Sequence, residues 1–165
     1  MEITQETKEY DKLKTKVLKY VLYKKRTEQE IRQKFIENTG NMLEDVIEYL
    51  KQEKYIDDEN YIQKSVNEYI ALKNLSIKEL VYKLYTKGLA KNLIDDYVYE
   101  NKEKLLEYEI KSAVNLANKK SSAMKKDEIK EYLKKKGYMI ETINIATSDL
   151  WRREYGKQHI NIRNN

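Results

Sequence analysis

The chain has 165 residues, 40% of them hydrophobic and 37% charged, and its 33 Lys+Arg against 28 Asp+Glu give a formal net charge of +5. This balance is too apolar for a disordered chain and is typical of amphipathic helices. The absence of cysteine excludes disulfides, thiolate metal sites and thiol catalysis, and the absence of proline favours helices joined by short turns. No apolar stretch approaches the roughly 20 residues that span a bilayer, and the polar start lacks the apolar core of a signal peptide. We therefore expect a cytoplasmic protein without a membrane partner.

Hydrophobic residues recur with a period of 49 residues, which predicts an all-α chain of three tandem three-helix repeats. In chain order we expect an N-terminal arm at 1–10, repeats at 11–57, 58–103 and 104–150, and a basic tail at 151–165. The first repeat should hold helices at 11–25, 28–38 and 42–52. One added residue in the polar stretch 118–126 indicates a loop in the third repeat. The recurring sets are Leu13, Val17, Tyr20 and Val21 with Ile62, Val66, Tyr69 and Ile70, and Glu30, Ile31 and Phe35 with Glu79, Leu80 and Leu84 and with Glu128, Ile129 and Leu133.

Such repeats are helix-turn-helix-like and bury their apolar stripes by stacking, so we expect an elongated, curved array. Its long flank would be the working surface, because small-molecule sites require a concave apolar cavity instead.

The second helix of each repeat carries its own start and stop signals. Thr27 with Glu30, and Ser76 with Glu79, match the capping box in which each residue satisfies a free backbone N–H of the other. The third repeat has Lys125 at this position, so we expect Ser122 or Asp127 to serve as the cap, or the helix end to fray. Gly88 and Gly137 follow their helices where a left-handed residue is favoured, and Thr39–Gly40 should play that part in the first repeat.

The segment that joins the first two repeats contains Tyr55, Ile56, Asp57, Asp58 and Tyr61. We expect Asp57 or Asp58 to cap the following helix, because a carboxylate accepts the free N–H groups and opposes the positive helix end. Tyr55 and Ile56 should be buried against that helix, and Tyr61 should continue its apolar face. A metal or acid–base role for the two carboxylates is the weaker reading, since no histidine or third carboxylate accompanies them.

Residues 54–62, Lys-Tyr-Ile-Asp-Asp-Glu-Asn-Tyr-Ile, resemble the hallmark segment of the RecX family, and residues 25–34 and 76–89 resemble that family's second helices. Lys54 departs from the pattern, which has glycine there. The resemblance covers roughly residues 13–146 and implies a monomeric regulator of DNA recombination, DNA repair and the SOS response. Such a protein would lie in the helical groove of the RecA–single-stranded DNA filament and would inhibit its recombinase, ATPase and coprotease activities. The resemblance implies no catalytic residue, cofactor or metal, and only weak binding of single-stranded DNA.

The positive charge is concentrated toward the end of the chain. Residues 1–101 carry a net charge of −1 and residues 102–165 a net charge of +6, which favours a polyanionic partner. The alternative is that these side chains only solvate helix faces and oppose the negative helix C-termini. Trp151 with its basic neighbours could stack a base and hold its phosphate, or could anchor the last helix. The candidate contacts to RecA or DNA are Lys24, Lys25, Arg26, Arg32, Lys119, Lys120, Lys125, Lys126, Lys134, Lys135, Arg152 and Arg153.

Enzymatic chemistry finds little support. His159 is the only histidine and lies in a polar stretch, and no phosphate-binding Gly-rich loop precedes a Lys-Ser or Lys-Thr pair. Two functions remain: a regulator of the recombinase filament, or a stand-alone helical nucleic-acid-binding protein. They differ in whether naked DNA is bound well.

Overall fold

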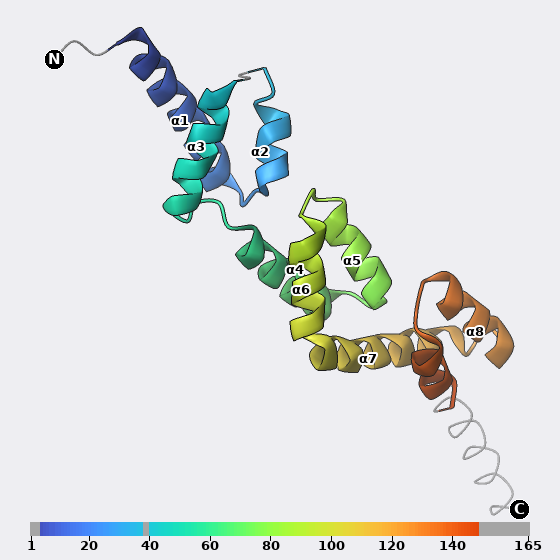
Figure 1. Cartoon of the computed structure of the whole chain (residues 1–165). Helices are drawn as coiled ribbons and strands as arrows, with labels where there is room; N and C mark the ends of the chain where they lie inside the picture. Colours follow the sequence, from blue (N-terminus) through green and yellow to red (C-terminus); the bar gives the residue numbers. More distant parts are fainter. Residues whose placement is uncertain (1–3, 38–39, 149–165) are drawn as a thin grey trace, which may run out of the picture. The chain divides into compact units, whose positions relative to one another are not determined.

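The computed structural model describes residues 4–37 and 40–148, and within these ranges every regular element is a helix, so the predicted all-α class is confirmed (Figure 1). No helix in this part of the chain is both long and apolar enough to cross a membrane. The helices are α1 (Gln5–Tyr23), α2 (Glu28–Lys34), α3 (Asn41–Gln52), α4 (Asp58–Leu72), α5 (Ile77–Tyr85), α6 (Lys91–Glu100), α7 (Lys102–Lys120) and α8 (Lys126–Lys135), and residues 140–148 are also helical.

The chain divides into two compact units, one formed by residues 1–65 and 84–96 and the other by residues 66–83 and 97–165. Each has a hydrophobic core of its own, described below. The arrangement of three repeats as an elongated, curved array stays a prediction.

In the first unit, α1 packs against α3, and the apolar stripe of α1 closes the core (Figure 1). The amide of Thr7 donates to the Thr4 hydroxyl, so the helix begins at Gln5 and residues 5–10 are helical rather than part of an arm. Ile31 of α2 joins the same core, and the ring of Phe35 meets Tyr20 edge-on at 5.7 Å between centroids. The buried residues are Leu13, Val17, Val21, Ile31, Leu43, Val46, Ile47, Leu50 and Ile56.

Helix α2 starts as predicted but ends earlier. The Glu30 amide donates to the Thr27 hydroxyl at 3.2 Å, and the Thr27 amide donates to the Glu30 carboxylate at 3.1 Å, which completes the capping box. The helix stops at Lys34 with Phe35 as its C-cap, so our extension to residue 38 was wrong. Gly40 does have positive φ, at 124°, but it serves as the N-cap of α3 rather than as the left-handed residue after α2; Thr39 lies outside the described residues.

Helix α3 ends with a lysine in the left-handed conformation. The Tyr55 amide donates to the carbonyl of Leu50 at 2.8 Å, and the Lys54 amide donates to the carbonyl of Lys51 at 2.9 Å. This pair of bonds is a Schellman motif, which requires positive φ at Lys54, observed at 59°. The side chain is tolerated in a conformation that costs an L-residue about 1–2 kcal/mol.

In the second unit, α7 packs against α8, and small residues of α7 allow close approach. Residues 121–125 form the loop between these helices, shorter than the polar stretch 118–126 suggested, because α7 continues to Lys120. The core of this part contains Ala113, Ala117, Ile129, Leu133, Tyr138, Ile143 and Ala146.

The start of α8 keeps half of a capping box. The Lys125 amide donates to the Glu128 carboxylate at 2.7 Å, but an ammonium group cannot accept a backbone N–H in return. Neither Ser122 nor Asp127 takes over, contrary to our expectation: Lys125 itself is the N-cap residue. In α5, by contrast, Ser76 and Glu79 form the full box, with both bonds at 3.0 Å.

Each complete capping box also contacts the backbone just after a later helix, α5 in one case and α8 in the other. In the first unit the Thr27 hydroxyl donates to the carbonyl of Lys87 at 2.7 Å; in the second, the Ser76 hydroxyl donates to the carbonyl of Lys136, also at 2.7 Å. An ion pair accompanies each bond, Lys87 with Glu30 at 3.7 Å and Lys136 with Glu79 at 3.0 Å. All these positions are 49 residues apart, so the sequence period extends to the contacts.

Gly88 and Gly137 are required at these contacts for two reasons. Their φ values are 75° and 85°, as predicted for the residue after each helix. A Cβ at Gly88 would lie 2.5 Å from the Cβ of Gln29, and one at Gly137 would lie 2.9 Å from the Cδ of Lys78. Gln29 and Lys78 are again 49 residues apart.

Candidate polyanion-binding surfaces

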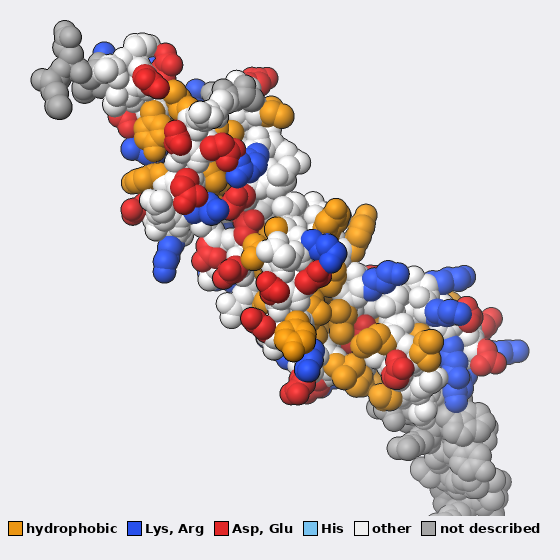
Figure 2. Space-filling model, viewed as in Figure 1, with side chains coloured by type: hydrophobic (Ala, Val, Ile, Leu, Met, Phe, Trp, Pro, Cys, Tyr) orange, Lys and Arg blue, Asp and Glu red, His pale blue; other side chains and the backbone are white. Residues whose placement is uncertain are grey.

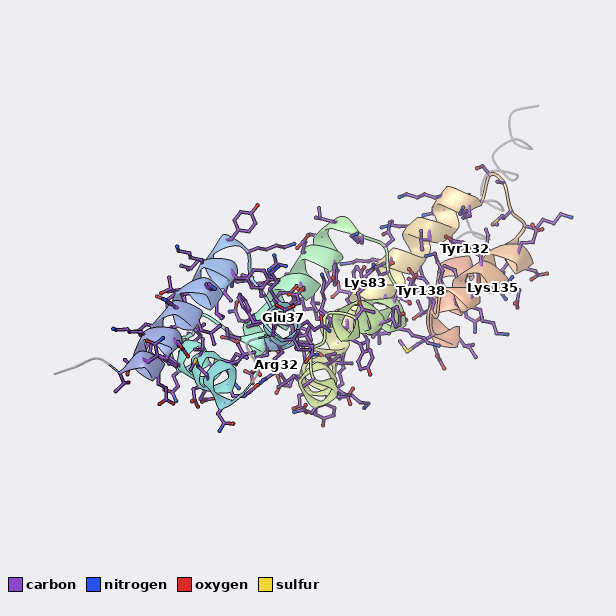
Figure 3. The ribbon with its side chains drawn as sticks, turned by 90° about the horizontal axis from the view of Figure 1, so that it is seen from above. Arg32, Glu37, Lys83, Tyr132, Lys135 and Tyr138 are labelled. Atoms are coloured by element: carbon purple, nitrogen blue, oxygen red, sulfur yellow. The ribbon has the colours of Figure 1, made fainter. Side chains whose placement is uncertain are left out.

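Arg32 is held by carboxylates. Its guanidinium bonds to Glu28 at 3.1 Å and also to Glu44, and these anions raise the pKa of the arginine further, Glu44 most. Lys51 contacts the same Glu28 at 2.8 Å. Figure 3 labels Arg32, which comes from α2, and Figure 2 shows Asp and Glu side chains gathered over α3. Such surroundings weaken the case for Arg32 as a contact to an anion.

Arg26 is partly anchored by packing. Its guanidinium carbon lies 4.4 Å from the ring centroid of Tyr20, a cation–π contact that also covers the ring. Its Nε atom is buried and has no hydrogen-bond partner within the described residues. The exposed part of this side chain borders the hollow described next.

Lys24 and Lys25 border a hollow in the first unit, together with two lysines that the sequence did not single out. The hollow, about 650 Å³ in volume, lies between the α1–α2 turn and the α3–α4 turn, and Lys54 and Lys64 complete its basic lining. We call it the first hollow. It is lined by Val21, Leu22, Tyr23, Lys24, Lys25, Arg26, Lys54, Tyr55, Asp57, Asn60, Tyr61 and Lys64.

The two aspartates of the joining segment have different structural roles. Asp57 accepts the Asn60 amide at 2.8 Å and so caps α4, as predicted for one of the pair. Asp58 instead accepts the amide of Glu28 at 3.2 Å. Burial, with the nearby Glu28 charge, raises the pKa of Asp58 to about 6, although the bond to the Glu28 amide acts in the opposite direction. No cluster of three metal-ligating side chains occurs in the part of the chain that the structure describes.

The apolar residues of this segment follow the prediction only in part. Ile56 is 3% exposed and belongs to the core of the first unit, and Ile62 is 1% exposed. Tyr61 is half-buried. Tyr55, predicted to be buried, is 48% exposed and faces the first hollow, so that expectation was wrong. The left-handed conformation of Lys54 explains the exposure of Tyr55, because it ends the helical pattern of α3 directly before that residue.

The second unit carries the other basic cluster. Lys119 and Lys120 end α7, Lys125 and Lys126 lie at the start of α8, and Lys134 and Lys135 end it. Figure 2 shows Lys and Arg side chains gathered where α8 lies, and Figure 3 labels Lys135 and Tyr132 of that helix. Two cations lie near the Tyr132 ring, with Lys120 Nζ at 5.2 Å and Lys136 Nζ at 5.9 Å from its centroid.

Helix dipoles do not account for this whole cluster. Lysines at the ends of α7 and α8 oppose a negative helix end, as the structural alternative requires. Lys125 and Lys126 lie at the positive end of α8, where the dipole disfavours a cation. Arg152 and Arg153, with Trp151, lie outside the described residues. Contact of any of these residues with RecA or DNA stays a prediction.

Two curated proteins with similar sequences carry the same name. Regulatory protein RecX of Staphylococcus carnosus is 33% identical over 138 residues, which are 81% of this chain and 52% of that protein. Regulatory protein RecX of Staphylococcus epidermidis is 32% identical over 154 residues, 88% of this chain and 58% of that protein. The chain thus spans about half the length of the curated relatives it matches. No family model matches the chain.

Solved structures agree in fold. The crystal structure of RecX from Lactobacillus salivarius matches with a TM-score of 0.72 and 24% identity over 86% of this chain and 96% of that one. A second crystal structure, of a regulatory protein RecX, matches with a TM-score of 0.74 and 20% identity over 90% of this chain and 81% of that one. The fold of this chain and the hydrophobic cores of its two units define an all-helical protein of the same fold class as these two structures. Together with the sequence matches, this fold supports assignment of the chain to the RecX family.

Proposed function

We propose that this chain regulates the RecA recombinase by binding the RecA–single-stranded DNA filament in its helical groove and inhibiting recombinase, ATPase and coprotease activities. The observation that supports this most is the sequence match to proteins named regulatory protein RecX over more than four-fifths of the chain. The all-helical fold and the two basic clusters are compatible with a long anionic partner. The role needs no catalytic group, because a ligand that prefers one state of a filament shifts its equilibrium by that preference alone.

The test is titration of the purified chain into RecA strand-exchange and ATPase assays with single-stranded DNA. We expect both activities to fall as the chain is added, while RecA alone stays active. A charge-depleted variant, Lys125→Gln with Lys135→Gln, should need a higher concentration for the same inhibition. Lys12→Gln with Lys16→Gln, which removes as much charge from exposed positions of α1, is the matched control.

A binding comparison separates this proposal from a stand-alone nucleic-acid-binding protein. A filament regulator binds RecA-coated single-stranded DNA well and naked DNA poorly at near-physiological salt. Equal affinity for the two, with no change in RecA activity, would contradict the proposal and support the stand-alone alternative.

A further inference from the structure

The first hollow combines a large open volume with an excess of positive charge. Five cationic side chains and one carboxylate, Asp57, line it. The carboxylate is engaged, because it accepts the Asn60 amide as the cap of α4. The cations therefore outnumber the anions that could neutralise them inside the hollow.

Two of these cations lie close enough to repel each other. The Lys25 ammonium donates to the side-chain oxygen of Asn60 at 3.1 Å, and Lys64 lies one helical turn after Asn60. The neighbouring Lys64 lowers the pKa of Lys25, and the lesser effect of burial acts in the same direction. An anion held between the two ammonium groups would relieve this repulsion.

Aromatic rings stand at the edge of the same hollow. Tyr23 is 89% exposed and Tyr55 is 48% exposed, although both side chains are large and apolar. Exposed aromatic rings beside a basic groove are the arrangement with which proteins bind single-stranded nucleic acids, since bases stack on the rings and cations follow the backbone. A patch for an acidic protein surface would need the charges but not the rings.

The second unit contains a hollow whose lining residues 70, 73 and 74 are offset by 49 from residues 21, 24 and 25 of the first hollow, and it differs in these features. This second hollow has a volume of about 290 Å³ and is lined by Lys73, Lys104 and Lys111 with Ile70, Asn74, Glu107, Tyr108, Ser112 and Asn115. Glu107 pairs with Lys111 at 2.6 Å. The hydroxyl of Tyr108 donates to the carbonyl of Lys73, so this ring serves the fold.

We propose that the first hollow is a binding site for single-stranded nucleic acid, in which Lys25 and Lys64 hold one backbone phosphate and Tyr23 and Tyr55 stack with adjacent bases. This deepens the proposed function, because it gives the regulator its own contact with the strand inside the filament. The second hollow, with less room and a paired carboxylate, does not share the role.

The test measures binding of a fluorescein-labelled oligothymidylate of about 12 nucleotides to the full chain, without RecA, by anisotropy at low salt. Lys25→Gln with Lys64→Gln should lower the affinity at least about fivefold and reduce the slope of log affinity against log salt by about 0.7 for the lost phosphate contact. Tyr23→Ala with Tyr55→Ala should lower the affinity and leave that slope unchanged. The matched control, Lys73→Gln with Lys104→Gln, removes the same charge from the second hollow and should have little effect.

Three results would overturn the proposal: equal losses in the two lysine variants, no loss in the tyrosine variant, or displacement of the oligonucleotide by oligoglutamate of equal charge as readily as by unlabelled oligothymidylate. Circular dichroism confirms that each variant is folded. The RecA assays are separate: a chain that binds the oligonucleotide as described but leaves RecA unaffected would remove the proposed function and keep the site. If the chain inhibits RecA but the Lys25/Lys64 variant binds the oligonucleotide as tightly as the parent, the site is refuted and the proposed function is kept.

Discussion

The hydroxyl of Ser76 donates a 2.7 Å hydrogen bond to the carbonyl of Lys136, sixty residues along the chain. The same oxygen accepts the Glu79 amide, so one side chain caps the start of α5 and satisfies a free carbonyl beyond the end of α8. Ser76 is fully buried, and so is Thr27, which makes the equivalent pair of bonds in the first unit.

Ser76→Ala should therefore lower the free energy of unfolding by about 1–3 kcal/mol, since it removes a cap and leaves a carbonyl without its donor. Urea denaturation measures this. Ser76→Thr is the control, because threonine performs both tasks at position 27, and it should retain most of the stability. An equally large loss of stability in the threonine variant would show that the space around position 76, and not the hydroxyl, determines the stability.

Lys125→Ser should stabilise the chain. The Glu128 carboxylate already accepts the Lys125 amide, and a hydroxyl would add the missing half of the box. We expect a gain of roughly 0.5–1 kcal/mol, seen as a higher midpoint of thermal unfolding. Lys125→Ala provides no acceptor and should show no such gain; equal behaviour of the two variants would contradict the assignment.

Lys54→Gly should also stabilise the chain, by about 1 kcal/mol, because glycine adopts positive φ without the steric cost that lysine bears at 59°. The urea midpoint should rise with an unchanged dependence on denaturant. Lys54→Ala keeps a Cβ and so serves as the control. A glycine variant no more stable than the alanine variant would mean that the turn carries no strain.

Asp58→Asn tests the raised pKa of Asp58. The folded pKa of about 6 lies above the ordinary value of 3.8, so the carboxyl binds protons more tightly in the native state. Its contribution to stability is complete below pH 3.8 and is lost as the pH rises through 6.

Asparagine can still accept the Glu28 amide but does not ionise. Above pH 6 the melting midpoint of the variant should lie a few degrees above that of the parent, and below about pH 4 the two midpoints should coincide. Asp58→Ala lacks the acceptor and should melt below the asparagine variant throughout. A difference between Asp58→Asn and the parent that does not vary with pH would refute the assignment.

Glu109→Ala should be among the more damaging single changes in the second unit. The fully buried carboxylate accepts the Ile77 amide at 2.9 Å and the Thr142 hydroxyl at 2.8 Å. Its removal leaves the buried Thr142 hydroxyl and the half-buried Ile77 amide unpaired, at a cost of about 2–4 kcal/mol. Glu107→Ala, two residues earlier on α7, breaks only the exposed pair with Lys111 and should leave the melting midpoint unchanged. Similar losses in both variants would contradict this.

The helix start and stop signals could be predicted because they are local. The capping boxes at Thr27 and Ser76 and the two glycines each depend on residues within one or two helical turns, and they reappear in the structure. The arrangement of three repeats stays a prediction. The end of α2 could not be predicted, because Ile36 and Glu37 continue a helical sequence pattern although the structure has a turn at residues 35–37.

The site was predictable only in part. Lys24 and Lys25 stood out as neighbours in sequence, whereas Lys54 and Lys64 are isolated there and join them only when two turns meet. The exposure of Tyr55 depends on the left-handed conformation of Lys54. The hallmark segment of the family, which has glycine at that position, would have suggested this conformation. The pair of Arg32 with Glu28, four residues apart on α2, is local, but nothing local reveals the pair with Glu44, since Glu44 comes from the next helix.

The bond between Ser76 and Lys136 also has a kinetic consequence. Because one hydroxyl bonds both the Glu79 amide and the Lys136 carbonyl, we expect deuterium exchange in the first turn of α5 to be coupled to opening of the segment just after α8. Local opening is then shared by two segments that are distant in sequence, and the α5 amides are protected from deuterium exchange by residues outside that helix.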